Sequence, residues 1–284
     1  MTNAVTIFEM GPRDGLQNEA GFVPTADKIK LVDLLSKTGL TKIEIASFVS
    51  PKWVPQMADG AEVCAGINRK VGTTYSALTP NMRGFDAAIA AGVDEIAVFA
   101  SASEGFSQAN INCGVVESFA RFHPLMTAAR AADMPVRGYV SCVTDCPFDG
   151  PTPPEAVAKV VRALHDMGCY EVSLGDTIGQ GTPESVGRML DVVVPTRVPL
   201  AGHFHDTNGR ALDNIAVALD HGLRVFDAAV GGLGGCPYAP GAQGNVATEA
   251  VVQMLADLGY DTGIDPAKLA IAATFAQTLR THNV

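Results

Sequence analysis

Residues 200–206 read Leu-Ala-Gly-His-Phe-His-Asp, a short β-rich run whose polar side chains gather at its C-terminal end. Seven more short β-rich runs occur along the chain, separated by stretches in which apolar residues follow the i, i+3, i+4 spacing of amphipathic helices. The eight predicted strands are 5–10, 42–47, 73–78, 95–101, 136–142, 171–177, 200–206 and 225–231. The helical spacing is clearest at 28–35, 85–91, 119–132, 156–167, 185–194 and 215–221.

Eight alternating strand and helix units predict either a closed barrel or a large doubly wound sheet. No Gly-x-Gly-x-x-Gly pattern follows the first strand, and eight such units fit the typical length of a (β/α)8 barrel, about 250 residues. We therefore expect an α/β fold of the TIM-barrel type, with 1–284 forming a single catalytic domain. The barrel is expected over about 4–260. An additional C-terminal helix over about 265–281 is expected to pack on the barrel or on a second subunit.

Composition restricts the class of protein. Apolar residues make up 47% of the chain and charged residues 18%, and no apolar run approaches the roughly 18–20 residues of a membrane span. The net charge of −10, without a Lys/Arg-rich run, argues against nucleic acid or an anionic membrane as a partner. The first predicted strand begins by residue 5 and leaves no room for a signal or transit segment, so we expect a cytoplasmic protein.

The six cysteines show no paired spacing of a zinc knuckle, and we expect them to be reduced. Cys142 and Cys146 are separated by three residues, not by the two of a redox pair. We interpret the five cysteines other than Cys236 as small apolar residues.

Active sites of this fold lie at the C-terminal ends of the barrel strands, in the loops that follow them. Most of the polar side chains that could do chemistry fall at such positions. They are Arg13 and Asp14 after the first strand, Glu44 and Ser47 on the second, Tyr139 on the fifth, Asp176 at the end of the sixth, His203 and His205 on the seventh, and Cys236 and Asn245 after the eighth. We expect them to share one face of the molecule.

The pattern His203-Phe204-His205 places two imidazoles on the same side of a strand, which is a chelating spacing. With the Asp14 carboxylate and the Asn245 amide oxygen they form a mixed N/O set that suits Mg²⁺ or Mn²⁺ better than a structural Zn²⁺. Two histidines at a barrel end without a metal are the alternative, because His-x-His is short enough to occur by chance.

Arg13 directly precedes Asp14, so a metal on Asp14 would place the guanidinium near a substrate oxyanion that it could stabilise. A surface arginine that caps a loop is the alternative reading. Glu44 lies on an apolar strand and needs a partner; Arg13 is the natural one, for structure or for catalysis. Asp176 could be a base or a residue that hydrogen-bonds a ligand histidine, and the sequence does not separate these roles. We assign Arg13, Ser47 and Tyr139 to substrate binding.

Cys236 lies between Gly235 and Pro237 in a loop with many glycines, 231–245. A thiol there can exchange a proton near neutrality, so we predict general acid/base chemistry for it. A covalent nucleophile would want an adjacent base, and the histidines are committed to metal. The alternatives are a small residue in a glycine turn, or a phosphate-binding loop that lacks the Walker Gly-Lys-Ser/Thr ending.

Several segments together resemble the 3-hydroxy-3-methylglutaryl-CoA lyase family, within the wider superfamily of metal-dependent lyases and Claisen-condensing barrels. They are Gly-Pro-Arg-Asp-Gly-Leu-Gln-Asn-Glu at 11–19, Ser-Phe-Val-Ser-Pro-Lys-Trp-Val-Pro-Gln-Met at 47–57, Gly-Asp-Thr-Ile-Gly at 175–179, His-Phe-His-Asp-Thr at 203–207 and Gly-Leu-Gly-Gly-Cys-Pro-Tyr-Ala-Pro-Gly at 232–241. The resemblance runs nearly end to end. It implies cleavage of an acyl-CoA substrate, the hydroxymethylglutaryl thioester, to acetoacetate and acetyl-CoA in leucine breakdown and ketone-body formation.

The resemblance also implies roles for individual residues. The family's metal ligands fall on Asp14, His203, His205 and Asn245, its substrate-stabilising arginine on Arg13, its catalytic cysteine on Cys236, and its supporting acidic residues on Glu44, Asp176 and Glu249. Glu249 lies in what reads as the first turn of a helix. A homodimer is a further implication. Animal members carry a targeting segment and a C-terminal cysteine extension that this sequence does not show, so neither organelle import nor an intersubunit disulfide is expected.

Two rival functions remain open at this point. The first is a related barrel that acts on another acyl-CoA or a 2-oxo acid, by condensation or aldol cleavage. The second is a catalytically silent barrel that serves as a scaffold. Metal-dependent turnover would distinguish the scaffold from both enzymes.

Overall fold

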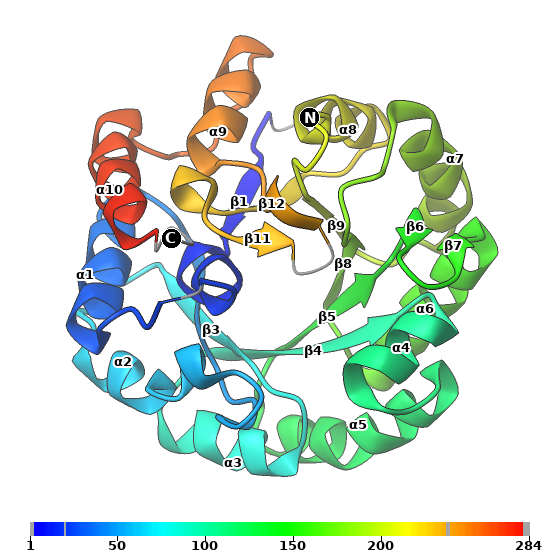
Figure 1. The fold of residues 1–284 in the computed structure, drawn as a ribbon, viewed down its shortest axis with the longest axis horizontal. Helices are drawn as coiled ribbons and strands as arrows, with labels where there is room; N and C mark the ends of the chain where they lie inside the picture. Colours follow the sequence, from blue (N-terminus) through cyan, green and yellow to red (C-terminus); the bar gives the residue numbers. More distant parts are fainter. Residues whose placement is uncertain (1–2, 20, 237–238, 281–284) are drawn as a thin grey trace.

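The computed structural model describes residues 3–19, 21–236 and 239–280, without the side chains of 235–243. Eight parallel strands close into a barrel in the order β1-β10-β9-β8-β5-β4-β3-β2, with helices around the outside (Figure 1). The barrel strands are β1 Thr6–Glu9, β2 Lys42–Ser47, β3 Thr74–Leu78, β4 Glu95–Ser101, β5 Val136–Ser141, β8 Glu171–Asp176, β9 Leu200–Phe204 and β10 Val225–Ala228. The predicted (β/α)8 barrel is therefore confirmed, each strand lying within its predicted range.

The helices that follow the strands form the outer layer. They are α1 Thr25–Leu35, α2 Gly60–Gly66, α3 Met82–Ala90, α4 Glu104–Ile111, α5 Val115–Ala131, α6 Pro154–Met167, α7 Pro183–Val193, α8 Ala211–Asp220, α9 Thr248–Asp257 and α10 Pro266–Leu279. The apolar spacing had not singled out α2, α4 or α9, and the first two of these helices are short. No helix in the described ranges is both long and apolar enough to cross a membrane.

Helix α6 illustrates how the local sequence builds this layer. Pro154 occupies its first turn, where a missing N–H costs nothing. Its apolar residues recur on one face and are buried against the barrel. The helix ends at Gly168, whose φ of 118° is a left-handed conformation that side chains other than glycine rarely adopt.

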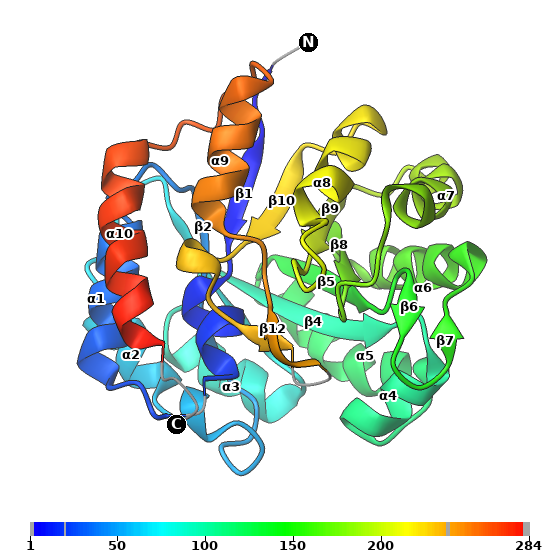
Figure 2. The same ribbon diagram turned by 45° about the horizontal axis from the view of Figure 1, so that its top comes forward.

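Two short hairpins were not predicted. β6 Asp145–Cys146 pairs with β7 Gly150–Pro151, and β11 Gly235–Cys236 pairs with β12 Ala239–Gln243, both antiparallel. Figure 2 shows the β11–β12 hairpin at the same end of the barrel as the helical turn that follows β1. This is the end at which the barrel strands terminate, so the hairpin lies over the face that the sequence predicted to be functional.

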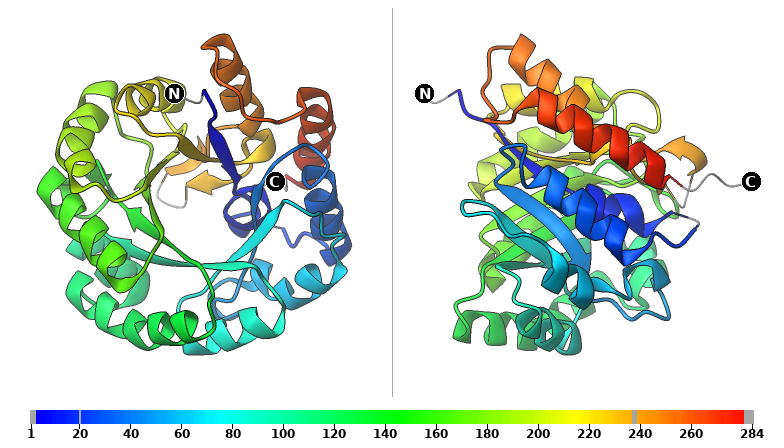
Figure 3. Two further views of the ribbon diagram at one scale, coloured as in Figure 1. Left: turned by 180° about the vertical axis from the view of Figure 1, so that it is seen from behind. Right: turned by 90° about the vertical axis from the view of Figure 1, so that its left-hand side faces the viewer.

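The predicted C-terminal helix exists as α10. Asp265 caps it by accepting hydrogen bonds from the Ala267 and Lys268 N–H groups. Its buried face includes Leu269 and Ala272, and the helix runs alongside α1 (Figure 3, right). From its end, the Arg280 guanidinium donates to the Gly231 carbonyl, so this helix is tied to the loop that follows β10.

Candidate metal and active site

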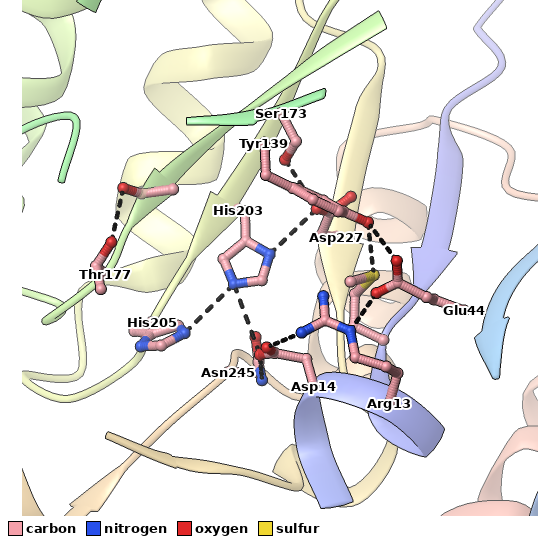
Figure 4. Close-up of polar contacts among 12 residues, drawn as sticks. Arg13, Asp14, Glu44, Tyr139, Ser173, Thr177, His203, His205, Asp227 and Asn245 are labelled. Carbon is pink, nitrogen blue, oxygen red and sulfur yellow. Dashed lines mark hydrogen bonds and ion pairs between the residues drawn. The ribbon is translucent and has the colours of Figure 1, made fainter. Parts of the chain in front are cut away.

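The predicted Arg-Asp turn after β1 is a single π-helical turn, Gly11–Gly15. It brings Arg13 into the barrel mouth, where the guanidinium donates Nε to Glu44 Oε2 and Nη1 to Asp14 Oδ1 (2.6 Å), as Figure 4 shows. The side chain of Glu44 is fully buried and that of Arg13 is 7% exposed. Burial raises the pKa of the Glu44 carboxyl, an effect that the Arg13 charge opposes. The predicted pairing of Arg13 with Glu44 is therefore confirmed.

Three of the four predicted metal ligands face one another (Figure 4). His203 is the penultimate residue of β9 and His205 follows the strand, with their Nε2 atoms 3.3 Å apart. His203 Nε2 lies 4.0 Å from Asp14 Oδ2, and the ligand atoms of these three residues all lie within 4.8 Å of one another. Asn245 lies beside this group, because its amide Nδ2 donates to Asp14 Oδ2 over 2.8 Å.

The donor set fits a hard or borderline divalent cation. Burial and the neighbouring His203 lower the pKa of His205 to about 4, so this imidazole is neutral at pH 7. Although burial opposes it, Arg13 and the two histidines hold the pKa of Asp14 below its usual range. An ionised carboxylate and imidazole lone pairs converging on one point are typical of a cation site. The predicted mixed N/O group is thus brought together by the structure.

Comparison with known proteins identifies the family. A family model described as HMGL-like matches residues 4–275. The chain belongs to the HMGL-like family. It is 58% identical over 274 residues to the mitochondrial hydroxymethylglutaryl-CoA lyase of Gallus gallus, which covers 95% of this chain and 92% of that one. The family resemblance inferred from the motifs is therefore confirmed.

Two bacterial proteins, one of them with a solved structure, are also similar to this chain. A Pseudomonas aeruginosa protein named 3-hydroxy-3-isohexenylglutaryl-CoA/hydroxymethylglutaryl-CoA lyase is 58% identical over 264 residues, covering 92% of this chain and 88% of that one. The crystal structure of the HMG-CoA lyase from Brucella melitensis superposes with a TM-score of 0.96 at 61% identity, covering 98% of this chain and 99% of the other. The barrel of this HMGL-like protein is thus similar to a solved lyase over nearly its whole length.

Tyr139, one of the predicted substrate contacts, lies beside the Arg13–Glu44 pair in this member of the HMGL-like family. Its hydroxyl donates to Glu44 Oε1 over 3.2 Å and accepts from Arg137 Nη1 at the same distance. The Arg13 guanidinium lies 5.8 Å from the centre of the Tyr139 ring. Tyr139 therefore belongs to the group that the barrel mouth assembles.

Three other predicted residues have their described hydrogen bonds outside the group formed by Arg13, Asp14 and the two histidines. Asp176 accepts from Thr144 Oγ1 (3.1 Å) and from the Gly181 N–H (2.9 Å), and burial raises its pKa to about 6. Glu249 accepts from the Gly231 N–H over 3.0 Å. Ser47 Oγ accepts from the Val49 N–H over 3.4 Å. Among the described residues, none of these three side chains is hydrogen-bonded to a ligand histidine, so their catalytic and supporting roles stay predictions.

Cys236 lies in β11, and its side chain is outside the described residues. Its assignment as a proton donor or acceptor therefore stays a prediction.

Five buried charged residues of the barrel strands were not predicted as site residues. They are Glu9 on β1, Glu95 on β4, Arg137 on β5, Glu171 on β8 and Asp227 on β10. Arg137 donates two hydrogen bonds to Asp227 (2.8 and 3.1 Å) and one to Glu171 (2.8 Å). Arg137 and Asp227, like Glu44, interrupt apolar strands and need a buried partner. Their sequence context could therefore have indicated both residues.

Glu9 connects the loops that carry the site. Its Oε1 accepts from the N–H groups of Gly11 (2.7 Å) and Val230 (2.8 Å), and its Oε2 accepts from Thr248 Oγ1 (2.7 Å). Gly11 begins the turn that holds Arg13, Val230 precedes the β11–β12 hairpin, and Thr248 begins α9. One buried carboxyl therefore fixes the starting points of two loops and of helix α9.

Proposed function

We propose that this chain is a carbon–carbon lyase that cleaves 3-hydroxy-3-methylglutaryl-CoA to acetyl-CoA and acetoacetate, a reaction of leucine breakdown and ketone-body formation. The observation that carries the proposal is the convergence of Arg13, Asp14 and His203 at the strand ends of a barrel. This barrel is 58% identical to a hydroxymethylglutaryl-CoA lyase over 95% of its length.

We propose that Asp14, His203, His205 and Asn245 hold a divalent cation, Mg²⁺ or Mn²⁺. The ligand types support this choice, because the Asp14 carboxylate is combined with two imidazoles and the described part of the site offers no thiolate. When bound, such a cation acts as a Lewis acid toward the substrate oxygens.

Arg13 acts in the proposal as the electrostatic stabiliser. Its described hydrogen bonds use Nε and Nη1, so the Nη2 side of the guanidinium fork is left to meet an oxygen of the substrate. Held by two carboxylates, the guanidinium does not need to reorganise as negative charge develops on the thioester oxygen.

The proposed reaction is a retro-Claisen cleavage. A base removes the proton of the tertiary hydroxyl, and a carbonyl forms at that carbon while its bond to the α-carbon of the thioester breaks. The released electron pair becomes the enolate of acetyl-CoA, which takes a proton from the Cys236 thiol. Asp176 is the base in this proposal, because a pKa of about 6 suits proton transfer near neutrality. An Asp176→Asn variant that kept the rate and pH profile of the wild type would remove Asp176 from this role.

The test of the function is release of acetoacetate from 3-hydroxy-3-methylglutaryl-CoA by EDTA-stripped protein, with and without added Mg²⁺ or Mn²⁺. We expect turnover only with metal, and its loss in His203→Ala. The matched control is His221→Ala, which removes a histidine at the C-terminal end of α8. Absence of turnover with either metal would contradict the proposed activity.

A second substrate follows from the Pseudomonas aeruginosa relative, whose name includes 3-hydroxy-3-isohexenylglutaryl-CoA and whose identity to this chain is also 58%. Both thioesters place the same hydroxyl, carboxylate and CoA groups around the bond that breaks. The ratio of kcat/KM for the two substrates, measured on one preparation, decides which is preferred.

Three organisational features complete the proposal. We propose a homodimer, a single domain over 1–284 and a cytoplasmic location. Exposed Ile271 on α10, 59% accessible, supports a contact on that helix, and the bacterial relative supports the location. Sedimentation equilibrium tests the dimer. Unfolding followed by fluorescence and by circular dichroism tests the single domain, for which we expect one coincident transition.

A further inference from the structure

We propose that Asp227 is a positioning residue that holds the proton of His203 on Nδ1 and so presents the Nε2 lone pair of this imidazole to the metal. The inference rests on the proposed metal site. It concerns two side chains on neighbouring barrel strands, β9 and β10, where Asp227 is in register with His203.

The contact between the two residues is direct. His203 Nδ1 lies 3.1 Å from Asp227 Oδ2, and the opposite ring nitrogen, Nε2, faces His205 and Asp14. An ionised carboxylate accepts hydrogen bonds and cannot donate one. A hydrogen bond between these atoms therefore requires the proton to be on Nδ1, which leaves Nε2 as the ligand atom.

Asp227 is held in its ionised form by its other partners. Its side chain is fully buried, yet Arg137 donates to both of its oxygens and Ser173 Oγ donates to Oδ2 over 2.8 Å. The cationic Arg137 fork, bonded to both oxygens, favours the ionised carboxylate. In each of these described hydrogen bonds an Asp227 oxygen is the acceptor. A proton on the carboxyl group would replace at least one of them.

The orientation of His203 is fixed by a chain of contacts across the barrel interior. The Arg137 guanidinium stacks 4.2 Å from the centre of the Phe8 ring and donates Nε to Glu171. A carboxylate fixed at one position fixes the rotation of the imidazole that it contacts. The ring is thus aimed at the metal position before any metal arrives.

The competing explanation is that Asp227 serves only as a counter-charge for the buried Arg137. Glu171→Gln separates the two explanations, because it removes the other carboxylate partner of Arg137 and Glu171 has no described contact with His203. A purely structural role predicts that Asp227→Asn and Glu171→Gln behave alike in metal binding. A positioning role predicts that they differ.

The first experiment is ¹⁵N NMR of the metal-free wild-type protein at pH 8.5, with the His203 signals assigned by their loss in His203→Ala. We expect neutral His203 with its proton on Nδ1. A proton on Nε2 would overturn the inference. This measurement does not depend on whether any variant at position 227 folds.

The second experiment is titration of stripped protein with Mn²⁺, with the free ion followed by electron paramagnetic resonance. We expect one site in the wild type and binding weakened about 10- to 100-fold in Asp227→Asn, the usual effect of removing the partner of a ligand histidine. Equal weakening in Asp227→Asn and Glu171→Gln would contradict the inference. A wild type that bound no Mn²⁺, or a His203→Ala variant that bound it normally, would refute the metal site itself.

Discussion

Glu9 makes the stability of this barrel depend on pH. Burial raises the pKa of its carboxyl from 4.5 to about 7, against the opposing hydrogen bonds from Thr248, Val230 and Gly11. In the unfolded chain the same carboxyl titrates near its ordinary value, so the folded state binds more protons between these two pH values. The stabilising contribution of protonated Glu9 is therefore complete below pH 4.5 and is lost as the pH rises through about 7.

The magnitude follows from the two pKa values. The difference between 4.5 and about 7, at about 1.4 kcal/mol per pH unit, corresponds to about 3 kcal/mol of unfolding free energy. Glu9→Gln has the shape of the protonated acid and does not titrate. We therefore expect it to match the wild type near pH 4.5 and to exceed it by up to about 3 kcal/mol at pH 8.

Urea unfolding of both proteins at several values between pH 4.5 and pH 8.5 measures this difference. Glu155→Gln, which replaces an exposed carboxyl in the first turn of α6, is the control for the chemical change alone. A Glu9→Gln variant that was less stable than the wild type at pH 8, or a difference that did not vary with pH, would show that the buried carboxyl is ionised in the folded protein.

Three further outcomes can be checked. Arg13→Lys replaces the fork that joins Glu44 and Asp14 with a point charge, so kcat/KM should fall about 10²-fold or more in steady-state assays; the exposed Arg83→Lys should stay near wild type. Gly234→Ala forces a side chain onto φ +114° and 3.0 Å from Asn245 Nδ2, so it should lose more than about 1 kcal/mol and weaken Mn²⁺ binding. The control Gly209→Ala, at φ +66° in open space, should leave Mn²⁺ binding unchanged in the same titration. Mn²⁺ at 100 times its Kd should raise the unfolding free energy of stripped protein by about 2.7 kcal/mol in urea melts, and no rise would argue against a folded-state metal site.

The sequence was sufficient to predict the barrel and its functional end. Eight strand-like runs alternate with helices, and this fold places catalytic groups at the C-terminal ends of its strands. The positions of Arg13, Asp14 and His203 along the chain therefore predicted their convergence, which the structure confirms.

The sequence was insufficient for the residues that support the site from inside the barrel. Arg137 meets Glu171 through the register of the neighbouring strands β5 and β8, and it meets Asp227 of β10 across the barrel interior. No single strand contains that information. The β11–β12 hairpin was missed because its glycines and prolines read as an irregular loop. Contacts between neighbouring strands and contacts across the closed barrel must both be known before such partners can be assigned.

The hydrogen bond between Asn245 and Asp14 joins residues 231 positions apart in the sequence. In the folded barrel these two residues follow β1 and β10, the strands whose pairing closes the ring. During synthesis on the ribosome, Asp14 emerges early, and its metal site is complete only when nearly the whole chain has been made. A cation that binds the complete site stabilises the closed barrel relative to partly folded chains.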